Sequence, residues 1–204
     1  MDIGDNYAPE ATEETVRARS ATEWLKQLLP FAGLPFICAA LLLIGAGGSD
    51  AFILLRIELI TIIGFLVAVE DIKTRTIPNR YLLILLVSWI VIMTPKLFID
   101  TNTAVKMLLD SVLGFAAGGG LFLLVYVVSK KGLGGGDVKF MAVAGIYLGL
   151  GGTVVSMLYG SILAMITALV LIGLKKIKRD DAIPLAPFLY IGILITVFFA
   201  AATR

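Results

Sequence analysis

Two aspartates of this chain lie at the ends of apolar runs, where ionisable side chains are unusual. Asp71 closes one run, and Asp137 follows three glycines, Gly134, Gly135 and Gly136, and opens another. Ionisable groups at the edge of the hydrocarbon layer are energetically costly and are often functional. Two carboxyl groups are also sufficient for acid–base hydrolysis of a bond by water. We therefore predict that Asp71 and Asp137 form one site.

Each aspartate also has a simpler interpretation. Asp137 could be an ordinary helix N-cap, and Asp71 could belong to a solvated charge cluster with Glu70, Lys73 and Arg75. Three consecutive glycines exceed what a cap requires, however. The helix dipole also disfavours a negative charge at the C-terminal end of a helix, where Asp71 is expected. The dipoles of the two helices predict that Asp137 is ionised and that Asp71 holds a shared proton.

The composition is that of an integral membrane protein. Of the 204 residues, 59% are hydrophobic and 16% are charged, and the mean hydropathy is +0.98, far above the range of soluble domains. The chain has no histidine and one cysteine, Cys38, which excludes Ser–His and Cys–His nucleophile pairs and Cys-x-x-Cys metal sites within the chain. We expect no metal, no cofactor and no nucleic-acid partner.

Apolar runs follow a polar N-terminal segment, residues 1–29. Ser20 and Glu23 have the spacing of a capping box, which predicts a short amphipathic helix at the membrane interface. The apolar runs cover residues 31–48, 51–70, 81–99, 105–129, 138–150, 153–174 and 183–202. The fifth run is too short to span a bilayer, so it is tilted, half-inserted, or fused to the sixth through Gly149, Gly151 and Gly152. We predict an all-α, polytopic transmembrane bundle of six or seven helices, with the membrane domain over residues 30–204.

The basic residues predict the orientation of this bundle. With a cytoplasmic N-terminus, thirteen of the seventeen Lys and Arg residues fall in cytoplasmic segments, in agreement with the positive-inside rule. Asp71 and Asp137 then both lie on the cytoplasmic side of the membrane.

Three further features concern packing and charge. Small residues between Gly114 and Gly120 predict close helix packing in lipid. Lys106 and Asp110 are four residues apart, which predicts an ion pair on one helix. Arg56 and Glu58 cannot face each other on a helix, so each needs another partner, and we expect them to have a structural role near the outer surface.

Three motifs resemble those of one peptidase family. Residues 134–137, Gly-Gly-Gly-Asp, resemble the Gly-x-Gly-Asp motif of intramembrane aspartyl proteases. Residues 71–79, from Asp71 to Pro78 and Asn79, resemble the first-aspartate motif of type IV prepilin peptidases, and residues 183–188 resemble the proline pair of their final helix. The motifs occur in the family order and cover about residues 51–200. The chain is most similar to the short branch of the family that has peptidase activity only.

The resemblance implies a membrane-embedded aspartyl endopeptidase in the plasma membrane. It implies that the basic leader of prepilins or pseudopilins is cleaved at the cytoplasmic face, that no metal or cofactor takes part, and that N-methyltransferase activity is not expected. Asp71 and Asp137 would be the catalytic pair. The supporting or substrate-binding positions would be Gly134, Gly135, Gly136, Lys139, Arg75, Pro78, Asn79, Pro184 and Pro187.

Two other classes of function compete with the peptidase. Glycine-broken helices with buried carboxylates also form the binding sites of ion-coupled transporters, although this chain has no repeated halves and its two aspartates are predicted at one membrane face. A non-catalytic assembly protein that keeps the fold is the second alternative.

Overall fold

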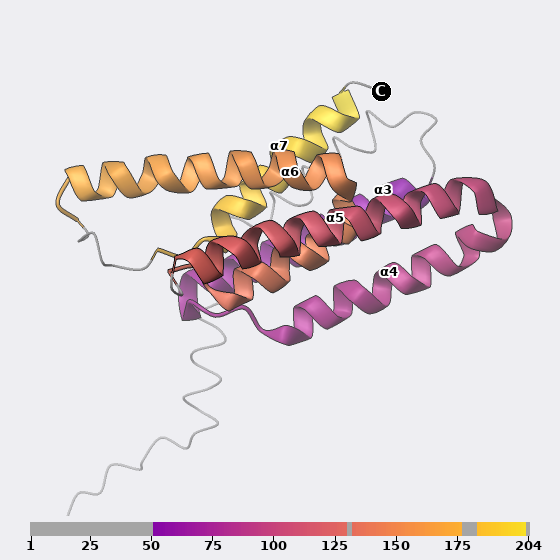
Figure 1. The fold of residues 1–204 in the computed structure, drawn as a ribbon, viewed down its shortest axis with the longest axis horizontal. Coiled ribbons are helices and arrows are strands. Elements are labelled where there is room, and N and C mark those ends of the chain that lie inside the picture. Colours follow the sequence, from indigo (N-terminus) through magenta and orange to yellow (C-terminus); the bar gives the residue numbers. More distant parts are fainter. Residues whose placement is uncertain (1–50, 130–131, 177–182, 203–204) are drawn as a thin grey trace, which may run out of the picture.

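The computed structural model describes residues 51–129, 132–176 and 183–202, which form helices and the turns between them (Figure 1). The five helices are α3 (Ala51–Thr74), α4 (Asn79–Ile99), α5 (Thr101–Val128), α6 (Gly135–Gly173) and α7 (Ala186–Ala202). The helices α3, α4, α5 and α6 are long and apolar enough to cross a membrane, and α7 is a shorter apolar helix. The all-α, multi-pass class expected from the sequence is therefore confirmed.

The predicted count of six or seven helices is not confirmed, since the described part of the chain contains five. The first apolar run, 31–48, and the amphipathic helix predicted within residues 1–29 lie outside the described residues. The fifth and sixth runs both fall inside α6, on either side of a kink at Gly149.

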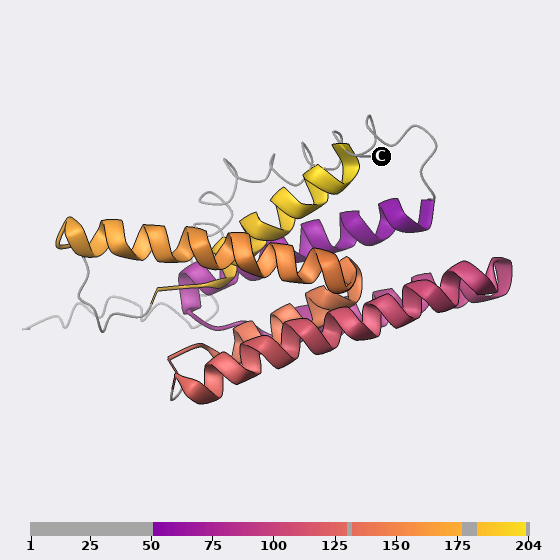
Figure 2. The same cartoon turned by 45° about the horizontal axis from the view of Figure 1, so that its top comes forward.

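A break at Gly149 divides α6 into two segments. Gly149 has φ 71° and ψ −178°, a conformation that only glycine adopts without strain, and a Cβ at this position would collide with the Asp110 carboxylate. The chain folds back at this point, as Figure 2 shows. The first segment packs antiparallel to α5, with Gly145 against Gly114, and the second segment packs antiparallel to α7.

Side chains from neighbouring helices satisfy the backbone groups that this break leaves free. The Arg56 guanidinium donates to the carbonyls of Ile146 (3.1 Å) and Tyr147 (2.7 Å), at the end of the first segment. The Asp110 carboxylate accepts from the N–H of Leu150 (2.9 Å), at the start of the second. Unsatisfied backbone groups are costly inside a bilayer, so these contacts allow the break to exist there.

The structure gives Asp110 other partners than the one expected from the sequence. Its carboxylate caps the second segment of α6 and interacts electrostatically with Arg56, whereas the sequence suggested an ion pair with Lys106 on the same helix. Arg56 has the structural role that was expected, and its partners are backbone carbonyls near the end of the bundle opposite Asp71.

Helices α5 and α6 approach each other through backbone atoms. A Cβ on Gly114 would collide with the carbonyl oxygen of Gly145, and a Cβ on Gly118 would collide with that of Met141. Contacts of this kind replace the hydrophobic driving force that helices lack in lipid. The prediction of close packing from the glycine-rich run of α5 is confirmed.

Contacts along α3 define the direction of the remaining helices. A Cβ on Gly64 of α3 would lie 3.1 Å from the Tyr190 ring of α7, and Asp71 contacts Ala186 at the start of α7. Helix α3 is thus antiparallel to α7. It is also antiparallel to the first segment of α6, because Arg56, near the start of α3, donates to the carbonyl of Tyr147 at the end of that segment. The C-terminal end of α3 and the N-terminal ends of α6 and α7 therefore meet at one end of the bundle.

We expect Gly114→Ala to lower the stability of the bundle by about 1–3 kcal/mol, because the new methyl group must displace the α6 backbone. Thermal unfolding in detergent micelles measures the effect. Gly120→Ala on the same helix is the control, since nothing lies within 4 Å of a Cβ at Gly120, and it should be neutral or slightly stabilising. Equal destabilisation by both substitutions would contradict the packing described here.

Candidate active site

Asp71 and Asp137 lie where the three helix ends meet. Asp71 is in the last turn of α3 and Asp137 is in the first turn of α6, and their exposed fractions are 6% and 8%. The two carboxyl groups are close enough to interact electrostatically. The structure thus brings together two buried acids that are distant in sequence and that come from two different membrane-capable helices.

A backbone hydrogen bond joins Asp71 to α7. Asp71 Oδ2 accepts from the N–H of Ala186 at 3.0 Å, and Ala186 is the first residue of α7. The first N–H groups of a helix have no partner within the helix, so Asp71 satisfies one of them. Pro187, the next residue, has no N–H to satisfy, and its ring is accepted in a first helical turn.

This contact adds a second helix end to the proton assignment made from the sequence. That assignment considered only the C-terminal end of α3, where the dipole opposes a negative charge. Asp71 also lies at the N-terminal end of α7, where the dipole favours one. Both aspartates therefore lie at a helix N-terminus, so the helix dipoles alone do not distinguish which of them holds the shared proton, and its assignment to Asp71 stays a prediction.

Glycines shape the segment that leads into Asp137. Gly134 is the N-cap residue of α6, and its carbonyl accepts from the N–H of Asp137 at 3.1 Å. A Cβ on Gly134 would lie 2.7 Å from Asp137 Oδ2, and one on Gly136 would lie 3.1 Å from the side chain of Ile77. Gly135 faces open space. A side chain at Gly134 or Gly136 would thus press against a neighbouring side chain, whereas one at Gly135 would not.

One oxygen of Asp137 is left without a protein partner. Asp137 Oδ1 is buried, and no described residue forms a hydrogen bond with it. A buried carboxyl oxygen normally has such a partner, so this atom retains its capacity to bind a water or a substrate group. Within the described ranges, no cluster of three or more His, Cys, Asp or Glu side chains is present.

The remaining predicted positions lie in the turn between α3 and α4, at the start of α4, in α6 and just before α7. Arg75 is exposed, has φ 52°, and follows the end of α3. Pro78 is the N-cap residue of α4, and Asn79, which opens α4, accepts from Lys139 Nζ at 3.4 Å. Lys139 therefore links α6 to α4. Pro184 precedes α7 and is partly buried.

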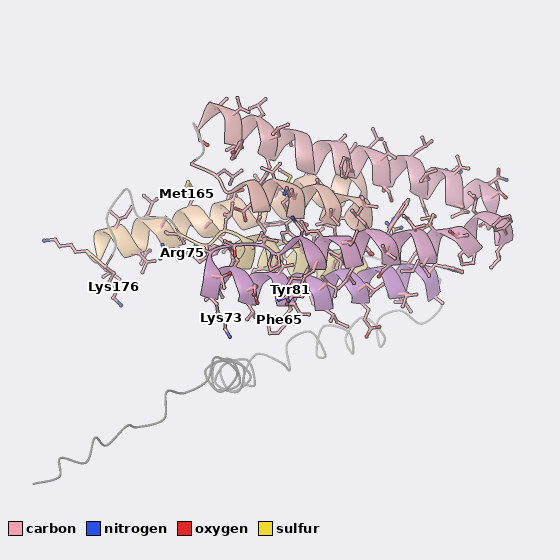
Figure 3. All side chains as sticks on the ribbon, turned by 90° about the horizontal axis from the view of Figure 1, so that it is seen from below. Phe65, Lys73, Arg75, Tyr81, Met165 and Lys176 are labelled. Carbon is pink, nitrogen blue, oxygen red and sulfur yellow. The ribbon has the colours of Figure 1, made fainter. Side chains whose placement is uncertain are left out.

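Cations gather at the same end of the bundle. Figure 3 shows Lys73, Arg75 and Lys176 there, and Arg80 forms an ion pair with Glu70 at 3.7 Å.

Two residues that contact the aspartate segments, Ala186 and Ile77, were not predicted as site residues from the sequence. The proline pair pointed to the Ala186 segment, but a backbone N–H has no sequence signature, and Ile77 could not be distinguished from any other apolar residue.

Comparison with known proteins assigns the family. Residues 58–169, just over half of the chain, match the type IV leader peptidase family, and the chain belongs to this family. The matched range contains both Asp71 and Asp137. The resemblance inferred from the three sequence motifs is therefore confirmed at the level of the family.

Two curated relatives are both called prepilin leader peptidase/N-methyltransferase. The protein from Pectobacterium carotovorum subsp. carotovorum is 34% identical over 167 residues, which cover 78% of this chain and 54% of the relative. The protein from Legionella pneumophila is 30% identical over 129 residues, which cover 63% and 44%. The chain spans about half the length of these relatives. No solved structure matches the chain significantly.

We expect Asp71→Leu to be less stable than Asp71→Asn by about 1–3 kcal/mol, because leucine leaves the buried N–H of Ala186 without an acceptor. The asparagine variant also loses the negative charge but keeps a side-chain oxygen, so it is the matched control. Thermal unfolding of both variants in micelles measures the difference. Identical unfolding temperatures would show that the contact between α3 and α7 does not depend on this hydrogen bond.

Proposed function

We propose that this protein is a membrane-embedded aspartyl endopeptidase that removes the basic leader from type IV prepilins or pseudopilins. Asp71 and Asp137 are the catalytic pair in this proposal. The observation that carries it is the meeting of two buried, electrostatically interacting carboxyl groups at the ends of α3 and α6. Membership of the type IV leader peptidase family and the names of the two relatives support the substrate class.

The chemistry requires one ionised and one protonated carboxyl group. The ionised group takes a proton from water as the water oxygen attacks the carbonyl carbon of the scissile peptide bond, and the protonated group donates to the carbonyl oxygen. The C–N bond then breaks as the carboxyl group that took the proton from water passes it to the departing nitrogen. The other carboxylate regains a proton from a hydroxyl of the tetrahedral intermediate, so that the products are a carboxylic acid and an amine. The oxygen of Asp137 without a protein partner is available to hold the water or the carbonyl.

The neighbouring residues position this pair in the proposed mechanism. The Ala186 N–H orients Asp71, and Gly134 allows the Asp137 carboxyl to lie against the loop before α6. Lys139 and Asn79 hold the start of α4 next to the start of α6, while Gly136 accommodates Ile77 of the turn that precedes α4. Arg75, Pro78, Pro184 and Pro187 have conformational roles at the helix ends.

We place the site on the cytoplasmic side of the inner (plasma) membrane. The end of the bundle that carries the aspartates also carries Lys73, Arg75, Arg80, Lys139, Lys175 and Lys176, whereas Lys96 and Lys106 lie on the opposite side of the spans. An excess of basic residues in short loops is typical of the cytoplasmic side.

One observation favours the rival transport function. Helix α6 is broken at Gly149, and broken helices form binding sites in secondary transporters. The groups freed by this break are occupied by Arg56 and Asp110, however, and the aspartate pair lies at the other end of the first α6 segment. The peptidase proposal accounts for the aspartates, and the break is accounted for by packing.

Cleavage of a prepilin tests the proposal. When the protein is co-expressed with a prepilin that has a basic leader, the wild type should remove the leader, as seen by gel shift and by mass of the new N-terminus. Asp71→Asn and Asp137→Asn should each be slower by at least about 100-fold, because each removes one partner of the acid–base pair.

Asp100→Asn is the matched control. Asp100 lies between α4 and α5, and its side chain caps α5 by accepting from the N–H of Thr103, a contact that asparagine preserves. This variant should cleave at the wild-type rate. If both the Asp71 and Asp137 variants cleave as fast as the control, the aspartate mechanism is refuted. If the wild type does not cleave any prepilin, the assembly-protein alternative gains support.

A further inference from the structure

A groove of about 500 Å³ lies between α4, α5 and α6, on the side of α6 that faces α4. Its walls are apolar side chains, among them Leu83 and Leu86 of α4, Phe115 of α5 and Val143 of α6. Leu83 and Phe115 are 62% and 47% exposed. Because these helices are membrane-capable, the groove opens laterally toward lipid. We refer to it as the α4 groove.

The polar residues of the α4 groove are all at one end. Asn79 and Arg80 open α4, and Lys139 lies near the start of α6. The apolar lining residues follow one or two turns further into both helices. The groove is thus polar at the membrane boundary and apolar toward the bilayer interior, which is the arrangement of an amphiphile whose head group stays at the surface.

The two cations at this end are available to a ligand. Lys139 donates to the neutral amide of Asn79 at 3.4 Å, and no carboxylate of the described residues forms an ion pair with it. Arg80 is paired with Glu70 at 3.7 Å and donates to the Tyr81 hydroxyl at 3.3 Å, with its guanidinium 4.9 Å from the Tyr81 ring centre. Its side chain is 65% exposed, however, and exposed pairs of this kind contribute little. The charge of the groove entrance therefore fits an anionic head group rather than a basic one.

The size of the α4 groove distinguishes between two apolar occupants. A transmembrane helix of 20 residues is a cylinder about 30 Å long and about 10 Å across, or roughly 2,400 Å³, several times the volume of the groove. The volume of the groove lies in the range of small-molecule sites, roughly 300–1,000 Å³. A single acyl chain fits within a space of this size, whereas a helix could enter it only through the side chains of one face.

We propose that the α4 groove binds an anionic phospholipid, with an acyl chain along Leu83, Leu86 and Val143 and the phosphate between Arg80 and Lys139. Basic pockets between transmembrane helices at the cytoplasmic side bind anionic head groups for the same reason. The site lies on the face of α6 that Lys139 and Val143 share, at the end of the bundle that also carries the aspartate pair, and it requires neither aspartate. The proposal is independent of peptidase activity.

Native mass spectrometry of the purified full chain tests this site. The protein in detergent is titrated with phosphatidylglycerol and with phosphatidylcholine that has the same acyl chains, and the lipid-bound fraction is measured. The wild type should retain phosphatidylglycerol more strongly. Arg80→Gln or Lys139→Gln should weaken this binding roughly fivefold, and the double variant about 25-fold, since each cation near an anionic lipid contributes on that scale.

Two further variants control for charge and for shape. Lys176→Gln removes an exposed cation from the same end of the bundle, outside the α4 groove (Figure 3), and should leave phosphatidylglycerol binding unchanged. Leu83→Trp fills the groove from an exposed position, so it should reduce binding without unfolding the protein. Thermal unfolding of each variant verifies that the fold is retained.

Three outcomes would overturn the lipid site. The first is equal retention of the two lipids by the wild type. The second is equal loss of phosphatidylglycerol in Lys176→Gln and in the Arg80 and Lys139 variants. The third is capture of the apolar segment of a prepilin by a photo-crosslinker at Leu83, with phosphatidylglycerol binding unchanged in the Leu83→Trp variant, which would show that the groove holds protein. None of these results depends on whether the aspartates cleave a prepilin.

Discussion

The hydrogen bond from the Ala186 N–H to the Asp71 carboxyl is the contact on which the site depends. It joins the last turn of α3 to the first residue of α7, and it does so in a buried position where a lost partner would be costly. Asp137 approaches from a third helix end, through a glycine loop in which a Cβ at Gly134 would press against the Asp137 carboxyl. An acid that the C-terminal end of α3 alone would disfavour is thus accommodated at the N-terminal end of α7, where three helix ends meet.

The break at Gly149 makes this convergence possible. It divides α6 into a first segment, which packs against α5 and α3, and a second segment, which returns along α7. An unbroken helix could not make both sets of contacts. The break requires a positive φ, a carboxylate from Asp110 and a guanidinium from Arg56, so charged residues at the opposite end of the bundle contribute to the position of Asp137.

Much of this arrangement was predictable from local sequence, and the rest depended on contacts between distant segments. The apolar runs predicted the membrane-capable helices, the glycines of α5 predicted close packing, and the motifs around Asp71 and Asp137 predicted which acids belong together. The partners of Asp110 and Arg56 could not be predicted, because they are backbone groups of another helix. The dipole argument for Asp71 was incomplete for the same reason, since it considered α3 without α7.

The most direct test of the central claim, that Asp71 and Asp137 belong to one site, is a distance between spin labels beside them. With the native Cys38 replaced by serine, labels are attached at Ile72→Cys, which is 59% exposed, and at Gly135→Cys, which faces open space. We predict strong dipolar broadening of the continuous-wave EPR spectrum in liposomes. A spectrum without broadening, as for labels separated by the hydrocarbon thickness of about 30 Å, would contradict the account.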